Sequence, residues 1–134
     1  MSNLQDRREQ DLAAHCFPKL YSTFKSDMHV NFVMEAIEGV TLHDFQKHQV
    51  CIKLEQVKFF AAKTLVLLDY LHQLKIIFRD LKTENLMIDT IHGEIKLVDF
   101  GFAKDLTQNR KPGNRDRTFT KCGTPGYTAP EVLL

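Results

Sequence analysis

The chain has 134 residues, of which 43% are apolar and 26% are charged, and its formal net charge is +1. This composition is typical of one globular domain with an apolar core. A net charge so close to zero gives no general electrostatic reason to bind nucleic acid or anionic lipid. The sequence has no apolar run that could span a membrane and no apolar signal segment. Three scattered cysteines indicate a reduced, cytoplasmic chain without a disulfide framework.

Short helices and strands are predicted along the first third of the chain. Residues 1–14 predict a short polar helix. Apolar and polar residues then alternate over residues 20–25 and 30–35, which predicts two strands of an antiparallel hairpin. Thr41 is a good N-cap for a helix that runs from residue 42 towards residue 46.

The strongest helix signal covers residues 57–74. Apolar side chains occupy nearly the whole circumference of this helix, so we expect it to be buried on most sides. The pattern then changes to short apolar strands, at residues 76–78, 86–88 and 95–98. His92-Gly93 predicts the turn between the last two strands. Residues 102–121 predict a long basic loop, and the predicted fold class is α+β.

Four short motifs follow the long helix in a fixed order. They are FRDLKTEN at 78–85, DFG at 99–101, Gly-Thr-Pro at 123–125 and Ala-Pro-Glu at 129–131. Each alone has an ordinary explanation, such as a solvated charged face, a turn after a strand or the start of a helix. Together, in this order, they resemble the catalytic loop, magnesium-binding loop and activation segment of eukaryotic protein kinases.

Longer segments narrow the resemblance to the cyclic-nucleotide-dependent kinases of the AGC group. These segments are DFGFAK at 99–104 and TFTKCGTP at 118–125, and residues 15–35 are especially similar to cGMP-dependent kinases. The resemblance implies a partial kinase domain over residues 1–134, with the end of the N-lobe in 1–35. The hinge, catalytic loop and activation segment then lie in 36–134. We expect the Gly-rich loop, its lysine-bearing strand and the C-terminal helices to be absent.

The resemblance implies phosphoryl transfer from ATP, with Mg²⁺, to serine or threonine of a protein. Asp80 would accept the proton of the substrate hydroxyl, and Lys82 would neutralise charge on the moving phosphoryl group. Asn85 and Asp99 offer hard oxygen ligands that suit Mg²⁺. The hydroxyl of Thr124 would bridge Asp80 and Lys82.

Further positions are implied for the nucleotide and for the protein substrate. The hinge backbone around Glu35 and Ile37 would hydrogen-bond the adenine, and Met87 would form the apolar floor beneath it. A simple core position is the alternative for Met87. Glu84 would contact a basic residue near the target serine or threonine.

A regulatory site is implied in the activation segment. Thr120 would be phosphorylated, and its phosphate would pair with Arg79 and Lys104. An unmodified loop threonine is the alternative. The sequence also departs from the family pattern, with Phe78 in place of a histidine or tyrosine and Thr41 in place of a glutamate that contacts the ribose.

These observations predict a Ser/Thr protein kinase by family, with little or no turnover by the isolated 134 residues. The alternative is a non-catalytic, pseudokinase-like binding or regulatory fragment. Five large apolar side chains left exposed on the long helix would each forfeit about 1.5–3 kcal/mol. We therefore expect another kinase or a chaperone to cover that surface. The basic loop has no interleaved aromatic residues, so nucleic acid is not an expected partner.

Overall fold

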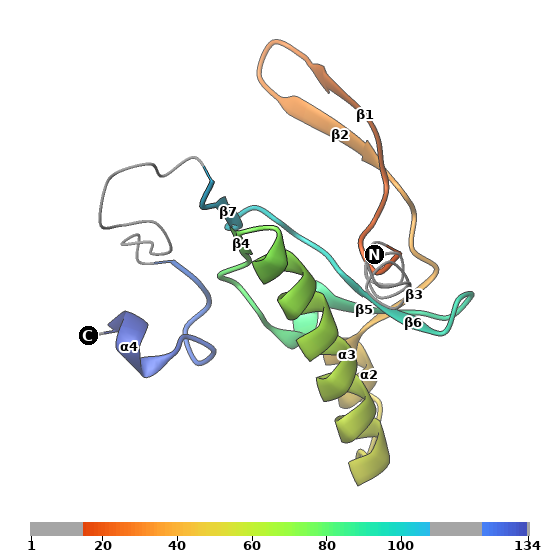
Figure 1. The fold of residues 1–134 in the computed structure, drawn as a ribbon. Coiled ribbons are helices and arrows are strands. Elements are labelled where there is room, and N and C mark those ends of the chain that lie inside the picture. The colour runs from red at the N-terminus through yellow and green to blue at the C-terminus, as the bar shows by residue number, and fades with distance from the viewer. Residues whose placement is uncertain (1–14, 108–121, 134) are drawn as a thin grey trace, which may run out of the picture.

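The computed structural model describes residues 15–107 and 122–133, which form a mixed α+β fold as predicted (Figure 1). The predicted helix over residues 1–14 lies outside the described residues. The elements are β1 (Leu20–Lys25), β2 (Val30–Met34), β3 (Gly39–Thr41), α2 (Leu42–Lys47), α3 (Leu54–Gln73), β4 (Ile76–Ile77), the 3-10 turn η1 (Thr83–Asn85), β5 (Leu86–Asp89), β6 (Glu94–Leu97), β7 (Lys104–Asp105) and α4 (Pro130–Leu133).

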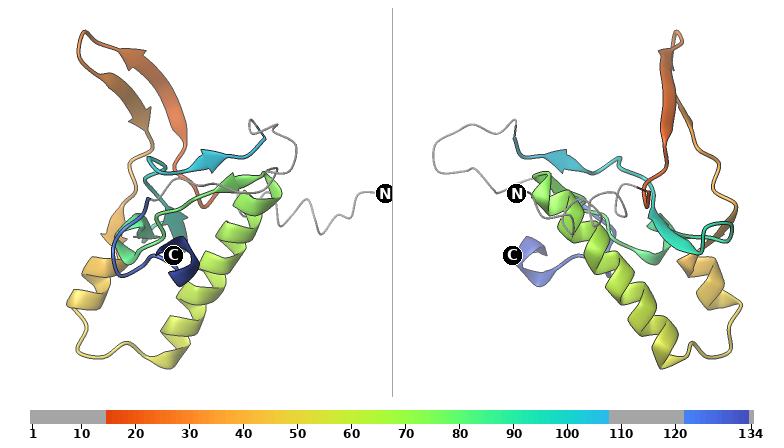
Figure 2. Two further views of the ribbon diagram at one scale, coloured as in Figure 1. Left: turned by 90° about the vertical axis from the view of Figure 1, so that its left-hand side faces the viewer. Right: turned by 45° about the vertical axis from the view of Figure 1, so that its right-hand side comes forward.

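The predicted hairpin is confirmed. β1 and β2 pair antiparallel, with Lys25 opposite Val30 beside the turn. The backbone N–H of Ser26 donates to the His29 carbonyl at 2.9 Å and closes that turn. The hairpin projects away from the rest of the molecule, as Figures 1 and 2 show, and every residue of β1 is exposed.

A three-stranded antiparallel sheet in the order β3-β5-β6 forms the centre of the fold. Successive side chains of a strand point to opposite faces. One face of β5 and β6 therefore carries Leu86, Ile88, Ile95 and Leu97, and packs into the core. β3 approaches β5 so closely that a Cβ on Gly39 would lie 1.8 Å from the Ile88 carbonyl oxygen. The predicted turn at His92-Gly93 is confirmed.

The two helices predicted within the described residues are present. The Thr41 hydroxyl accepts the Asp44 N–H at 3.0 Å and caps α2, as expected. α3 begins at Leu54 rather than at Val57, because the Lys53 N–H donates to the side chain of Gln56 at 3.0 Å and so satisfies a terminal backbone donor. None of the described helices is long and apolar enough to cross a membrane.

The burial predicted for α3 is wrong within the described structure. Only Leu67 and Leu71 of this helix are buried, because the described elements cover one side of it (Figure 1). Large apolar residues on the rest of the helix are 44–67% exposed: Leu54, Val57, Phe59, Leu65 and Val66. The core is formed by Cys16, Leu42, Leu67, Leu71, Phe78, Leu86, Ile95 and Leu97.

The prediction of an unbroken loop from residue 102 onwards is also wrong. Lys104–Asp105 forms β7, which pairs antiparallel with β4, so that Ile77 lies opposite Lys104. The Leu106 N–H extends this pairing by donating to the Lys75 carbonyl at 2.9 Å. A strand of two residues carries no periodic signal, since only its partner defines it.

Candidate active site

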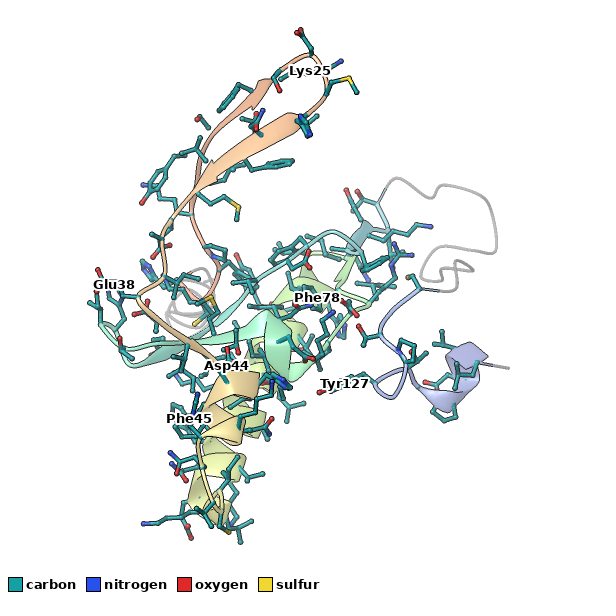
Figure 3. The ribbon with its side chains drawn as sticks, turned by 180° about the vertical axis from the view of Figure 1, so that it is seen from behind. Lys25, Glu38, Asp44, Phe45, Phe78 and Tyr127 are labelled. Atoms are coloured by element: carbon teal, nitrogen blue, oxygen red, sulfur yellow. The ribbon has the colours of Figure 1, made fainter. Side chains whose placement is uncertain are left out.

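The sequence-predicted catalytic residues come from three segments, which hydrogen bonds to Asp80 bring together. Asp80 follows β4, Asn85 ends η1 just before β5, and Thr124 belongs to the segment that leads to α4. In Figure 3, which views the molecule from behind, Phe78 lies inside the body of the molecule and Tyr127 lies on the C-terminal segment. Phe78 is only 2% exposed, so it anchors the loop that carries Asp80 in the core.

Asp80, Lys82 and Thr124 form a closed hydrogen-bonded triangle. The Thr124 hydroxyl donates to Oδ1 of Asp80 at 2.6 Å. Nζ of Lys82 donates to Oδ2 of Asp80 at 2.8 Å and to the Thr124 hydroxyl at 3.0 Å. Each carboxylate oxygen of Asp80 is therefore held by a separate donor, which fixes the plane of the carboxylate.

Asn85 also donates a hydrogen bond to the Asp80 carboxylate. Its side chain is buried, and Nδ2 donates to the Asp80 carbonyl at 2.9 Å and to Oδ2 of Asp80 at 3.2 Å. These two bonds fix the orientation of the amide, and both use its nitrogen rather than its oxygen. Carboxylate and amide oxygens are ligands that Mg²⁺ accepts, and this orientation leaves the Asn85 oxygen available as such a ligand.

The cluster keeps Asp80 ionised and Lys82 protonated. Burial acts to raise the pKa of the Asp80 carboxyl, but hydrogen bonds from Lys82, Thr124 and Asn85 outweigh it and hold that pKa below its usual value. The hydrogen bond to Asp80 raises the pKa of Lys82, helped by the charges of Glu84 and Asp99. The site therefore has an anion and a cation side by side at neutral pH.

Asp99 lies on the loop after β6 and close enough for its charge to act on Lys82. Its backbone is left-handed, with φ 62°, and its Oδ1 accepts the Gly101 N–H at 3.1 Å. The side chain is exposed, unlike that of Asn85. Two oxygen-bearing side chains thus flank the Asp80 cluster, a donor set that fits a hard divalent cation.

The predicted adenine-binding residues lie around the segment between β2 and β3. Glu35 follows β2 directly, and its N–H donates to the Lys19 carbonyl at 2.8 Å. Within the described part of the chain, the Glu35 carbonyl and the Ile37 N–H make no hydrogen bond. Met87 is half-buried in β5, opposite Thr41 of β3.

The predicted regulatory and substrate residues are only partly brought together. Nε of Arg79 donates to the Phe102 carbonyl at 2.6 Å, two positions before Lys104. Thr120 lies outside the described residues. Glu84 accepts a hydrogen bond from Thr83 at 3.3 Å, and the Thr83 hydroxyl also contacts the Tyr127 hydroxyl at 3.1 Å.

Sequence analysis missed an aromatic chain behind the site. The Phe100 ring lies 5.3 Å from Phe78 and 5.8 Å from Phe17, and Phe17 stacks on Tyr70 at 5.7 Å. These centroid distances are typical of favourable aromatic pairs. The four residues come from separate segments, so no local pattern predicts the chain. It ties the loop of Asp99 to the loop of Asp80.

A buried ion-pair network was missed as well. Lys96, in the middle of β6, is 4% exposed and pairs with Glu35 and with Asp89. The available signal was a lysine inside the apolar strand Ile95-Lys96-Leu97, since a buried cation requires a partner.

Comparison with known proteins supports the resemblance drawn from the sequence. The family model of the protein kinase domain matches residues 10–134. The chain is 43% identical over 125 residues to human cGMP-dependent protein kinase 2. This match covers 93% of this chain and 16% of that protein. It is 40% identical over 129 residues to cAMP-dependent protein kinase type 3 of Saccharomyces cerevisiae, covering 96% and 30%.

A cAMP-dependent protein kinase, catalytic subunit-like protein of Caenorhabditis elegans is 40% identical over 115 residues, covering 86% of this chain and 27% of that protein. The chain thus spans less than a third of the length of each of these three relatives. The order of the four motifs, the geometry around Asp80 and the match over residues 10–134 agree, and the chain belongs to the protein kinase domain family.

Proposed function

We propose that this chain supplies the catalytic loop of an ATP-dependent protein serine/threonine kinase of the AGC type. Residues 1–35 would belong to the N-lobe, and residues 36–134 would form the hinge, catalytic loop and activation segment. The single observation that carries the proposal is the hydrogen-bonded triangle of Asp80, Lys82 and Thr124. It holds an ionised carboxylate beside a cation, which is what phosphoryl transfer to a hydroxyl requires.

Each residue of the triangle has a distinct part in the proposed reaction. Asp80 accepts a hydrogen bond from the substrate hydroxyl and takes its proton as that oxygen bonds to the γ-phosphorus of ATP. The bond from this phosphorus to the bridging oxygen breaks, and ADP leaves. Lys82 stabilises the negative charge of the transferred phosphoryl group. Thr124 hydrogen-bonds both side chains and so fixes their positions relative to each other. Asn85 and Asp99 would hold Mg²⁺, which when bound neutralises charge on the ATP phosphates.

The same proposal extends to substrate, regulation and compartment. Glu84 supports a preference for substrates with basic residues near the target serine or threonine. Arg79 and Lys104 support phosphate binding at Thr120, since Lys104 belongs to β7 and Arg79 lies two residues after its partner strand β4. The three scattered cysteines support a reducing cytoplasm. The exposed apolar side of α3 supports a covering partner, either another kinase or a chaperone.

A segment exchange tests whether the catalytic loop is competent. Residues 15–134 would replace the matching segment of the S. cerevisiae type 3 kinase, which then supplies the remainder of a kinase domain. We expect the chimera to phosphorylate a basic serine peptide and the Asp80→Asn chimera to lose at least about a thousandfold in kcat. Asp44→Asn, on the exposed face of α2, serves as the matched control.

The exchange also separates the two functions considered for this sequence. A folded chimera that binds ATP but does not phosphorylate the peptide would exclude the kinase proposal and favour a binding fragment. Equal activity of the Asp80→Asn chimera and its parent would also overturn the proposed role of the triangle.

A further inference from the structure

The strongest feature outside the catalytic triangle is the cation of Lys96. Its side chain is 6% exposed, and its Nζ donates to Oε1 of Glu35 and lies 3.4 Å from Oδ2 of Asp89. A buried cation is stable only when carboxylates surround it. Lys96 therefore ties the first hinge residue to the end of β5.

The Asp89 carboxylate is held in place by hydrogen bonds within the β5–β6 turn. Its Oδ1 accepts the N–H groups of Ile91 and His92 at 3.0 and 3.1 Å. Its Oδ2 contacts Nδ1 of His92 at 2.8 Å in addition to Lys96. The ammonium group of Lys96 is thus anchored on a carboxylate that the β5–β6 turn already holds.

Glu35 is equally constrained on the hinge side. Its Oε2 accepts the Lys19 N–H at 3.0 Å, and its own N–H donates back to the Lys19 carbonyl at 2.8 Å. Oε1 is the atom that binds Lys96. The side chain therefore connects the start of β1, the end of β2 and the middle of β6.

The far end of the hinge, at Glu38, is attached to the β5–β6 turn. The Glu38 carbonyl accepts both the N–H and the hydroxyl of Thr90, at 2.9 and 2.8 Å. Gly39 then pairs with Asp89 in the sheet. Figure 3 shows Glu38 beside the β5–β6 turn. Only Ala36 and Ile37 lie between the two attachments.

Met87 lies on the same face of the sheet as this network. It is directly opposite Lys96 in the β5–β6 register, and directly opposite residues of an antiparallel pair share a face. The proposed adenine floor and the cation that holds the hinge are therefore cross-strand neighbours.

We propose that Lys96 is a positioning residue for adenine binding, acting through its ion pair with Glu35 to hold the Ile37 N–H at a fixed distance from Met87. The inference rests on the proposed function, since it assumes an adenine nucleotide. Lys96 does not touch the adenine; it sets the hinge geometry before the nucleotide arrives. Without it the hinge spends less time in the geometry that binds.

Adenosine is the probe that isolates this effect, because it carries no phosphates and does not need their binding groups. Titration of the 134-residue chain, followed by the amide signal of Ile37, gives its dissociation constant. If Lys96→Met leaves the hinge competent about a tenth of the time, the dissociation constant rises about tenfold. Lys96→Arg, which keeps the cation, is expected to restore most of the affinity.

Lys63→Met is the matched control. Lys63 also pairs with a glutamate, Glu94, but it comes from α3 and does not contact the hinge. We expect this variant to bind adenosine within about twofold of wild type. Because Lys96→Met leaves two carboxylates without their cation, Glu35→Gln is a second variant, which removes the negative charge from the same ion pair and keeps Lys96 beside Asp89.

The outcomes are distinct. Weaker binding by Lys96→Met and Glu35→Gln, with rescue by arginine and none of the loss in Lys63→Met, supports the inference. Equal binding by wild type, Lys96→Met and Glu35→Gln overturns it while leaving the proposed function in place. Failure of the wild-type chain to bind adenosine also overturns the inference, because a hinge held by Lys96 would then not suffice for binding, whereas the chimera tests the proposed function separately.

Discussion

The Thr124 hydroxyl donates to Oδ1 of Asp80 at 2.6 Å, although 44 positions separate the two residues in the sequence. This contact joins the segment before α4 to the loop after β4. It also contributes to keeping the Asp80 carboxyl ionised, because a donated hydrogen bond favours the charged form.

Removal of the Thr124 hydroxyl should therefore raise the pKa of Asp80. Thr124→Val deletes the donor at nearly constant volume, whereas Thr124→Ser retains it. A carboxyl-carbon NMR titration of Asp80 would follow the change directly. We expect a higher pKa in the valine variant and a value near wild type in the serine variant. An unchanged pKa in Thr124→Val would mean that Lys82 and Asn85 alone hold the carboxylate.

Asp89 should make the stability of the chain depend on acidity. Burial acts to raise the pKa of its carboxyl, but the hydrogen bonds from His92 and Ile91 lower it to about 2, from 3.8. A carboxyl whose pKa is lower in the folded state stabilises the fold above the unfolded pKa and loses that contribution as pH falls towards the folded one. The contribution, about 2 kcal/mol, is therefore lost between pH 4 and 2.

Urea unfolding between pH 2 and 6 measures this loss. The free energy of unfolding of the wild type should fall more steeply towards pH 2 than that of Asp89→Asn. Asp27→Asn, which changes an exposed aspartate of the hairpin turn, should keep the wild-type slope. Parallel curves for wild type and Asp89→Asn would contradict the assignment.

Gly39 should tolerate no side chain. A Cβ at this position would lie 1.8 Å from the Ile88 carbonyl oxygen, so Gly39→Ala must separate β3 from β5. We expect a loss of about 3 kcal/mol or more in the free energy of unfolding. Gly93→Ala is the comparison, since Gly93 has a positive φ but open space around it. Its loss should be about 1 kcal/mol. Similar losses for the two variants would refute the steric argument.

Neighbouring leucines of α3 should behave in opposite ways. Leu67 is 1% exposed and Leu65 is 67% exposed. Leu67→Ala should lower the free energy of unfolding by about 2–5 kcal/mol, because it leaves a cavity in the core. Leu65→Gln should change stability by less than about 0.5 kcal/mol and should reduce light scattering at high protein concentration. Increased scattering by Leu65→Gln would show that this face does not drive association.

Local signals in the sequence predict the parts of the fold that local chemistry determines. Thr41 fits the cap of α2, and alternation fits the hairpin of β1 and β2. β3 and β7 were missed, because neither has an apolar run like the one that predicts β4, and each is defined by a partner far along the chain. The triangle around Asp80 is implied by the family resemblance rather than by spacing. The pairing of Lys96 with Glu35 could not be predicted, since it depends on the register of β5 and β6 and on where β2 ends.

Arg79 and Asp99 share one further property, a left-handed backbone with φ 69° and 62°. For residues other than glycine this conformation costs about 1–2 kcal/mol each. The two loops that present the site are thus held in shapes that their isolated peptides would avoid. A glycine at position 79 would relieve that strain but release Asp80 from its fixed direction. A glycine at position 99 would relieve it only by removing the Asp99 carboxylate itself. In this chain, the stability of the fold and the fixed positions of the proposed site carboxylates are opposing demands on the same two positions.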